Sequence, residues 1–271
     1  MAWIRNTGQS VKWVIYSLLL INFGYYFLEE IYIASHTLSQ GGSLVDWAGA
    51  FATTFDEFAW LSLLLLFELE TWQLSDRALE RRSVRWSIHG LRVLCYLLLA
   101  HTVLQWTTGL LEFGRVAREP GLTSLCQVAG KDISFGSNYR YRVIDSSNCD
   151  SLSSDDRFYF LEPSVLTDHA GYRLERKLMW VDLNDACVWL IIVLLIELAV
   201  RLQERGADGR LLNGIDASTK LLYGVLIAHA IFWLWLGHWV YAWDQALWIG
   251  GFWFIGRNLA EWQRETKERG R

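Results

Sequence analysis

The sequence predicts an all-α membrane protein with six transmembrane helices, arranged as three helical hairpins, and a small α/β or β domain in one outer loop. Of its 271 residues, 52% are hydrophobic and 15% are aromatic, with 16 Trp and 2 Pro. The charged fraction is 20%, below the ~25% of ordinary soluble domains. The apolar residues form runs long enough to cross about 30 Å of hydrocarbon. These properties exclude a soluble globular fold and a disordered chain.

Six apolar segments are long enough to cross a bilayer, for which a helix needs roughly 20 apolar residues. The sixth is the least regular, because Gly250, Gly251 and Gly256 dilute it. A tight turn is expected at residues 242–244, between the fifth and sixth segments. The first segment is predicted to be a retained span and not a signal peptide, because no small-residue cleavage site follows it. The predicted spans are residues 11–35, 47–74, 88–113, 179–202, 219–241 and 245–262.

The membrane orientation follows from the positions of Lys and Arg. They gather at the N-terminus, between the second and third spans, between the fourth and fifth, and in the tail. The positive-inside rule therefore predicts cytoplasmic termini, in a bacterial inner membrane. One outer segment has nine basic residues, but long loops translocate largely regardless of charge. The expected organisation is transmembrane helices in 1–113, an extracytoplasmic loop domain in 114–178, and transmembrane helices with a cytoplasmic tail in 179–271.

The outer loop is predicted to be a small domain closed by a disulfide. Cys126 and Cys149 both lie in it, and an extracytoplasmic compartment permits their pairing. Residues 137–143 alternate like a strand, and residues 157–161 are expected to pair with them. Residues 145–156 are acidic and Ser-rich, which suits Ca²⁺, but they have no fixed ligand spacing. A solvated hairpin tip is therefore favoured there, and no metal or cofactor is expected.

A short motif recurs along the chain and indicates an internal repeat. In two segments an Asp is followed after four residues by Trp and after twelve by Glu, and further on a His follows a basic residue by nine positions. A third segment repeats the Asp and the Trp but has Gly in place of Glu. Repeats of this kind are common in transporters. The residues are Asp56, Trp60, Glu68 and His101, then Asp185, Trp189, Glu197 and His229, then Asp244 and Trp248.

The Asp and Trp of each copy are expected to anchor the helices in the membrane. Each Asp is placed at the outer start of an inward-running helix, where a carboxylate satisfies free backbone amides and complements the helix dipole. Each Trp follows one turn later and is expected in the aromatic belt. The anchoring residues are Asp56, Trp60, Asp185, Trp189, Asp244 and Trp248.

Two Glu and two His of the repeat form the candidate transport path. Glu68 and Glu197 lie about 18 Å along their helices from the anchoring Asp. His101 and His229 are placed about 14 Å from the inner face, so all four are expected near the middle of the bilayer. Ionisable groups at that depth indicate function by default. A Glu–His pair can pass protons, because both groups change protonation near neutral pH.

Two other uses of these residues remain open. They can be structural, because Glu197 has Arg201 four residues later and Glu68 can hydrogen-bond a neighbouring helix. His101 and His229 can also ligate the iron of a single haem.

The sequence therefore predicts a proton or cation channel or transporter in the lipid bilayer, either as a homo-oligomer or as a subunit of a membrane complex. No hydrolase, kinase or nucleotide-binding motif is present, so no enzymatic activity and no catalytic residue are expected. A net charge of −4 does not indicate a nucleic-acid partner. One alternative is a non-catalytic membrane subunit or sensor that binds a partner through the outer loop. The other is a single-haem b-type cytochrome.

Overall fold

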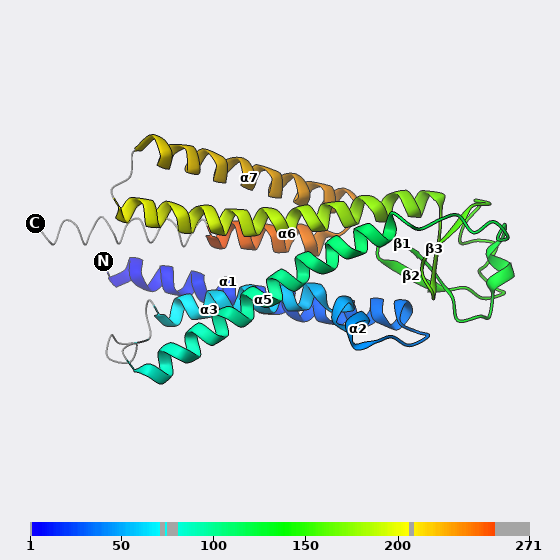
Figure 1. The fold of residues 1–271 in the computed structure, drawn as a ribbon, viewed down its shortest axis with the longest axis horizontal. Helices are drawn as coiled ribbons and strands as arrows, with labels where there is room; N and C mark the ends of the chain where they lie inside the picture. The colour runs from blue at the N-terminus through cyan, green and yellow to red at the C-terminus, as the bar shows by residue number, and fades with distance from the viewer. Residues whose placement is uncertain (1, 71–73, 75–80, 206–208, 253–271) are drawn as a thin grey trace, which may run out of the picture. The chain divides into compact units, whose positions relative to one another are not determined.

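The computed structural model describes residues 2–70, 74, 81–205 and 209–252. The chain forms two compact units, and Figure 1 shows the elements in chain order from blue to red. The first unit contains Met1–Asn22 and Cys187–Arg271, and the second contains Phe23–Ala186. Two long helices each have residues in both units.

Helices make up most of the described chain. The long ones are α1 (Ala2–Thr37), α3 (Ala52–Glu68), α5 (Arg82–Phe113), α6 (His169–Glu204) and α7 (Gly209–Trp235). The short ones are α2 (Leu44–Ala50) and the 3₁₀-helix η2 (Leu125–Val128). A last helical stretch covers residues 239–252, where the described chain ends.

Four of the described helices are long and apolar enough to cross a membrane, and the bent pair α2 and α3 would make a fifth span. Several membrane-spanning helices were expected, but six spans in three hairpins are not confirmed. The second predicted span is broken, since α2 and α3 meet at an angle of 63°. The sixth, 245–262, lies partly outside the described residues. The four spans are Trp13–Thr37, Arg82–Phe113, His169–Gln203 and Gly209–Trp235.

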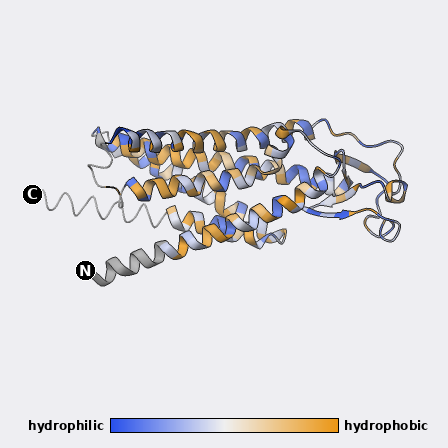
Figure 2. Ribbon diagram, turned by 90° about the horizontal axis from the view of Figure 1, so that it is seen from below, coloured by the Kyte–Doolittle hydropathy of each residue, from blue (hydrophilic) through white to orange (hydrophobic). Residues whose placement is uncertain are grey.

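Hydropathy separates the helices from the outer domain, by which we mean residues 114–168. In Figure 2 the long helices carry many hydrophobic residues along their length, whereas much of the outer domain is hydrophilic. Many large apolar side chains of the helices are exposed, among them Leu28, Leu97 and Leu221. Exposed apolar side chains along a helix fit a lipid environment, because hydrocarbon replaces the protein core as their apolar surroundings.

The turn after α7 lies earlier than expected. α7 ends at Trp235 and the next helix begins at residue 239. His238 donates its N–H to the carbonyl of Trp233 at 2.9 Å, and Gly237 donates to that of Leu234 at 3.1 Å. This is a Schellman motif, which needs a left-handed residue, and Gly237 has φ +84°. The predicted turn at 242–244 is therefore wrong.

The outer domain contains a small mixed sheet. Its strands are β1 (Ser134–Ser137), β2 (Arg140–Val143), β3 (Phe158–Glu162) and β4 (Val165–Asp168), in the spatial order β2-β1-β4-β3. β1 pairs antiparallel with β2 and parallel with β4, and β4 pairs antiparallel with β3. Strand β3 covers most of the segment expected at 157–161.

The single strand expected over 137–143 is instead the turn and second strand of a hairpin. Ser137 pairs with Arg140, which leaves Asn138 and Tyr139 as a two-residue loop. Both residues have positive φ, 58° and 57°, as a type I′ turn requires. The expected pairing with 157–161 is wrong as well, because β2 and β3 are opposite edges of the sheet.

A compact apolar core and the predicted disulfide hold the outer domain together. The core consists of buried side chains from η2, the strands and their connections: Leu122, Leu125, Val128, Ile133, Ile144, Cys149, Phe158 and Leu166. The Cys126–Cys149 disulfide is confirmed, with the two Cα atoms 4.9 Å apart. Its position beside the core explains why Cys149 is buried.

We expect the double variant Cys126→Ser, Cys149→Ser to destabilise the outer domain by about 3 kcal/mol, because a loop of 23 residues in sequence separation is no longer closed in the unfolded state. The check is hydrogen exchange of residues 122–166 in the purified full chain. The matched control is Cys187→Ser, since Cys187 is a free cysteine in the other unit. Equal exchange in both variants would show that the disulfide contributes nothing.

Candidate functional site at the break between α2 and α3

The break between α2 and α3 leaves backbone amides that need outside partners. α2 has its own N-terminal cap, in which Ser43 accepts from Asp46 N–H and Asp46 accepts from Ser43 N–H. α3 begins directly after Phe51, whose side chain makes no capping hydrogen bond. The first amides of a helix have no partner within it. At membrane depth such groups must be satisfied by other parts of the protein.

Glu30 of α1 supplies the missing cap. Its Oε1 accepts the N–H of Thr53 at 2.8 Å, and its Oε2 accepts that of Thr54 at 3.0 Å. The side chain is buried, with 8% of its surface exposed. A carboxylate in this position is stabilised by the positive end of the helix dipole as well as by the two hydrogen bonds. One buried carboxyl group on α1 therefore caps the start of α3.

Two residues of α5 hydrogen-bond to backbone carbonyl groups on either side of the break. His101 Nε2 lies 3.2 Å from the carbonyl oxygen of Ala48 in α2. Because a carbonyl can only accept, Nε2 carries the proton in this contact. Thr102 donates its hydroxyl toward the carbonyl of Ala52, also at 3.2 Å. Two neighbouring residues of α5 thus hold the two helix segments on either side of the break.

A glycine of α2 lies close to a side chain of α5. A Cβ on Gly49 would lie 2.9 Å from Oε1 of Gln105. The imidazole of His101 also lies edge-on to the ring of Phe55 in α3, with 6.0 Å between centroids. The side chains from α1 and α5 that meet the broken segment are those of Glu30, His101, Thr102 and Gln105, which we call the break site.

The chemistry of the break site couples charge to backbone geometry. An ionised Glu30 accepts one amide on each oxygen, whereas a protonated Glu30 keeps one strong acceptor and gains a donor. A change of protonation therefore weakens one of the two bonds to α3.

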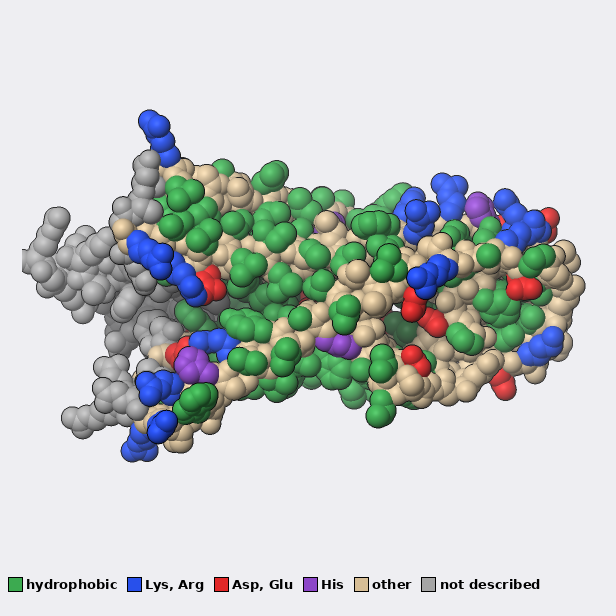
Figure 3. All heavy atoms as spheres, viewed as in Figure 1, with side chains coloured by type: hydrophobic (Ala, Val, Ile, Leu, Met, Phe, Trp, Pro, Cys, Tyr) green, Lys and Arg blue, Asp and Glu red, His purple; other side chains and the backbone are tan. Residues whose placement is uncertain are grey.

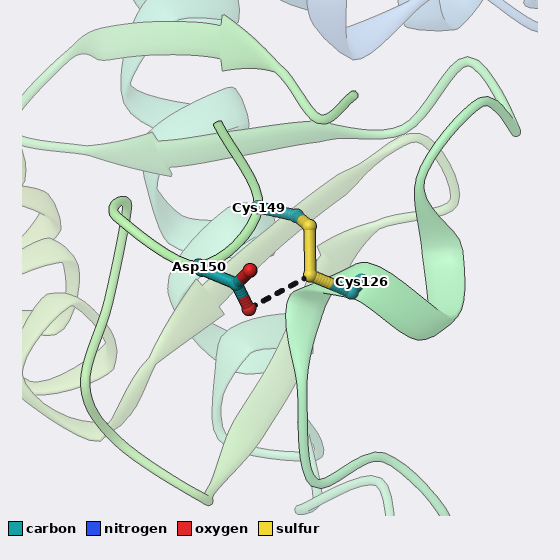
Figure 4. Close-up of side chains that lie close together, drawn as sticks. All are labelled: Cys126, Cys149 and Asp150. Atoms are coloured by element: carbon teal, nitrogen blue, oxygen red, sulfur yellow. Dashed lines mark hydrogen bonds between the residues drawn. A yellow bond between two sulfur atoms is a disulfide. The ribbon is translucent and has the colours of Figure 1, made fainter. Parts of the chain in front are cut away.

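One group of residues in the described chain is close enough together to suggest a metal ion, and it lies in the outer domain. It consists of Cys126, Cys149 and Asp150 (Figure 4). The Asp150 carboxylate lies 3.1 Å from Sγ of Cys126, but that sulfur belongs to the disulfide. Metals bind the thiolate form of cysteine. This group is therefore a disulfide with a neighbouring carboxylate.

The structure does not bring Glu68 and His101 together. His101 lies beside Ala48 and Phe55, at the first turn of α3, whereas Glu68 is the last residue of α3. The thirteen positions between Phe55 and Glu68 correspond to roughly 20 Å along the helix. The expected depth of Glu68 was counted from Asp56, taken as the outer end of its helix. Because α3 begins at the break after Phe51, Asp56 does not mark a helix end, and the expected equal depth of Glu68 and His101 does not follow.

Glu197 and His229 also lie at different heights in the first unit. Glu197 is seven residues before the end of α6 at Glu204, about 10 Å along the helix. His229 is twenty residues after the start of α7 at Gly209, about 30 Å. Glu197 is exposed and forms an ion pair with Arg201, as the structural alternative expected.

The Asp residues expected to anchor the helices are not helix caps, and the Trp residues expected to anchor them are buried. Asp185 lies inside α6 and Asp244 inside the stretch 239–252, so neither caps a helix. Asp56 is the fifth residue of α3. The rings of Trp60, Trp189 and Trp248 are buried, which is wrong for a belt in contact with headgroups.

Other Trp residues are exposed at positions that suit an aromatic belt. Trp235, at the end of α7, is 81% exposed, and Trp239, after the turn, is 67% exposed. In Figure 3, hydrophobic side chains cover the middle of the helices, and charged ones lie over the outer domain and at helix ends. In the described part of the chain, the exposed indoles are those of Trp13, Trp47, Trp86, Trp180, Trp235, Trp239 and Trp243.

The sequence contained a signal for the break site that its interpretation did not use. Glu29 and Glu30 are an acidic pair inside the first apolar segment, and an ionisable residue within a span indicates function by default. The repeated motif points instead to Glu68 and Glu197. The contact of Glu30 with Thr53 and Thr54 had no signal of its own, because it depends on the break.

Comparison with protein-family models, curated proteins and solved structures gives no match for this chain. Its class therefore follows from the structure alone. It is a mostly helical protein with four or five helices able to cross a membrane and a small, disulfide-closed mixed sheet.

Proposed function

We propose that the protein is an integral membrane channel or transporter for protons or small cations, and that the break between α2 and α3 is its gate. The observation that carries this proposal is the buried carboxylate of Glu30 on the first amides of α3. Discontinuous helices in transporters often form ion sites near the bilayer midplane. Protonation of Glu30, or a cation bound to it, would weaken the hold on α3 and let the broken segment move.

In this proposal the outer domain is extracytoplasmic and both termini are cytoplasmic, in a bacterial inner membrane. The disulfide supports this placement, since disulfides persist in oxidising compartments. The Arg residues between α3 and α5 support the opposite, cytoplasmic side for that connection. The oligomeric state, either a homo-oligomer or a subunit of a larger complex, stays a prediction, and so does any part of Glu68, Glu197 or His229 in conduction.

The test is proton and K⁺ flux into liposomes that contain the purified full chain. The wild type is expected to conduct, and Glu30→Gln is expected to change the flux about tenfold or more, since weakening a charged hydrogen bond is worth ~1.5–3 kcal/mol. Glu29→Gln is the matched control, because Glu29 is on the same helix but is only partly buried and accepts from Tyr25. Absence of wild-type flux at several pH values and voltages would contradict the proposal.

A sensor is the second candidate, and the contacts between the outer domain and the helices favour it. Ser164 donates to the carbonyls of His36 and Thr37 at the end of α1. The hydroxyl of Tyr139 donates to Asp182 of α6 at 2.5 Å. A partner that displaces the hairpin would therefore act directly on α6. In that case Tyr139→Phe would alter hydrogen exchange of α6 around Asp182, while Glu30→Gln would leave the response unchanged.

A further inference from the structure

The two sulfurs of the outer-domain disulfide differ in their access to solvent. Cys149 belongs to the apolar core and has 5% of its surface exposed. Cys126 lies in η2 and is not buried. A thiol that opens a disulfide must reach one of its two sulfurs, so access decides which one is attacked. The structure therefore leaves Sγ of Cys126 as the sulfur that an incoming thiol can reach.

A carboxylate lies beside this accessible sulfur. Oδ1 of Asp150 is 3.1 Å from Sγ of Cys126, and Figure 4 shows the carboxyl group directed at it. Because a disulfide sulfur carries no proton, this contact does not neutralise the charge of the carboxylate. Among the residues that the structure describes, no Lys or Arg forms an ion pair with Asp150. The accessible sulfur therefore has an uncompensated negative charge next to it.

The turn that contains Asp150 is held on both sides. Before it, Cys149 is part of the apolar core, and after it Leu152 packs against the same core. Across it, the N–H of Ser151 donates to the carbonyl of Asn148 at 2.9 Å. The backbone thus keeps the carboxylate close to the sulfur.

The charge of Asp150 opposes attack by a thiolate, which is the nucleophile in thiol–disulfide exchange. A thiolate that approaches Sγ of Cys126 brings a second negative charge close to the carboxylate. Salt weakens this repulsion only in part, because contact is shorter than the screening length of about 10 Å at 0.1 M salt. The electron pair of the broken bond passes to Sγ of Cys149 in the apolar core, where a charge is costly. Both effects slow the opening of the disulfide.

We infer that Cys126 is the site of thiol–disulfide exchange in this protein and that Asp150 selects the attacking thiol by its charge. In the first step a thiolate bonds to Sγ of Cys126, the bond between the two cysteines breaks, and Cys149 leaves as a thiolate that takes up a proton. A second thiol then releases Cys126, so two thiols are oxidised to one disulfide while the protein disulfide is reduced. The reductant that suits this site is a cationic thiol, or a protein thiol set among basic side chains. This selectivity is independent of the proposed function.

The test is the rate at which three thiols reduce the full chain in lipid bilayers, after alkylation of the accessible free cysteines. The thiols are mercaptoethanesulfonate, which is anionic, mercaptoethanol, which is neutral, and cysteamine, which is cationic. Asp150→Asn is expected to react about tenfold faster than the wild type with the anionic thiol, less so with the neutral one, and about equally with cysteamine. Each ratio compares two proteins with one thiol, so differences in the reactivity of the thiols themselves cancel.

Asp132→Asn is the matched control, because it makes the same change of charge at an exposed residue of the outer domain. Its φ of 53° is a conformation that Asn adopts readily, and it is expected to react like the wild type. The first mixed disulfide, trapped with acid and located by peptide mass, is expected on Cys126. Acceleration of Asp150→Asn that is the same with all three thiols would indicate a loosened outer domain and would overturn the inference. Wild-type rates in Asp150→Asn, or a first mixed disulfide on Cys149, would overturn it as well.

Discussion

Replacing Glu30 with Ala is expected to destabilise the second unit by ~3 kcal/mol or more, because two amides at the start of α3 lose their acceptor. Each hydrogen bond to a charged group contributes ~1.5–3 kcal/mol, and a buried donor left without a partner adds its desolvation cost. The residues concerned are Thr53 and Thr54, which bond the two oxygens of Glu30. The check is hydrogen exchange of residues 51–56 in lipid nanodiscs, together with thermal unfolding.

Two further variants separate capping from a general effect of lost charge. Glu29→Ala removes the neighbouring carboxylate, which is only partly buried, and is expected to change stability by less than ~1 kcal/mol. Glu30→Asp keeps the charge but shortens the side chain by one methylene, so we expect it to protect one amide and not both. If Glu30→Ala leaves exchange at residues 51–56 at the wild-type rate, Glu30 does not fix the start of α3.

The second large effect is expected for Gly171→Ala at the start of α6. A Cβ at this position would lie well inside van der Waals contact of Thr167 Oγ1 and 3.3 Å from Ser137 Oγ. Thr167 belongs to β4 and is fully buried, so it has no room to move away. Overpacking of this kind costs ~1–3 kcal/mol and occasionally more. We expect about 3 kcal/mol, measured as a lower unfolding temperature with faster exchange in the strands.

Gly121→Ala is the matched control within the outer domain, because a Cβ there would meet nothing within 4 Å. The double variant Gly171→Ala, Thr167→Ala removes the hydroxyl that the new methyl group would meet. The double variant is expected to be destabilised by less than the sum of the two single variants. A double-mutant cycle measures this difference directly. If the two effects on stability are additive, the destabilisation by Gly171→Ala does not come from a clash with the side chain of Thr167.

The large features of the fold could be predicted from the sequence because each depends on local composition. Apolar runs identified the membrane-crossing helices, and two cysteines in one outer loop identified the disulfide. The hairpin was misread because Tyr139, Arg140, Tyr141 and Arg142 continue an alternating pattern across the turn. A type I′ turn usually contains Gly, and Tyr139 gives no such signal.

The candidate site could not be predicted because it depends on a helix break that the sequence does not mark. The segment around Phe51 contains no Pro, and its apolar residues run without interruption from α2 into α3. If a membrane-spanning helix is assumed to begin at Asp56, Glu68 is expected at the same depth as His101. In the structure the partner of the broken segment is Glu30, from a helix that a spacing argument on α3 and α5 does not include.

The Schellman turn after α7 has a consequence for how the chain is inserted during synthesis. Three residues separate α7 from the next helix, and no charged residue occurs between Lys220 and Asp244. A connection this short and apolar is not expected to stay in water while the second helix is synthesised. We therefore expect α7 and the stretch 239–252 to enter a bilayer together as one hairpin, with the buried Asp244 among its apolar neighbours.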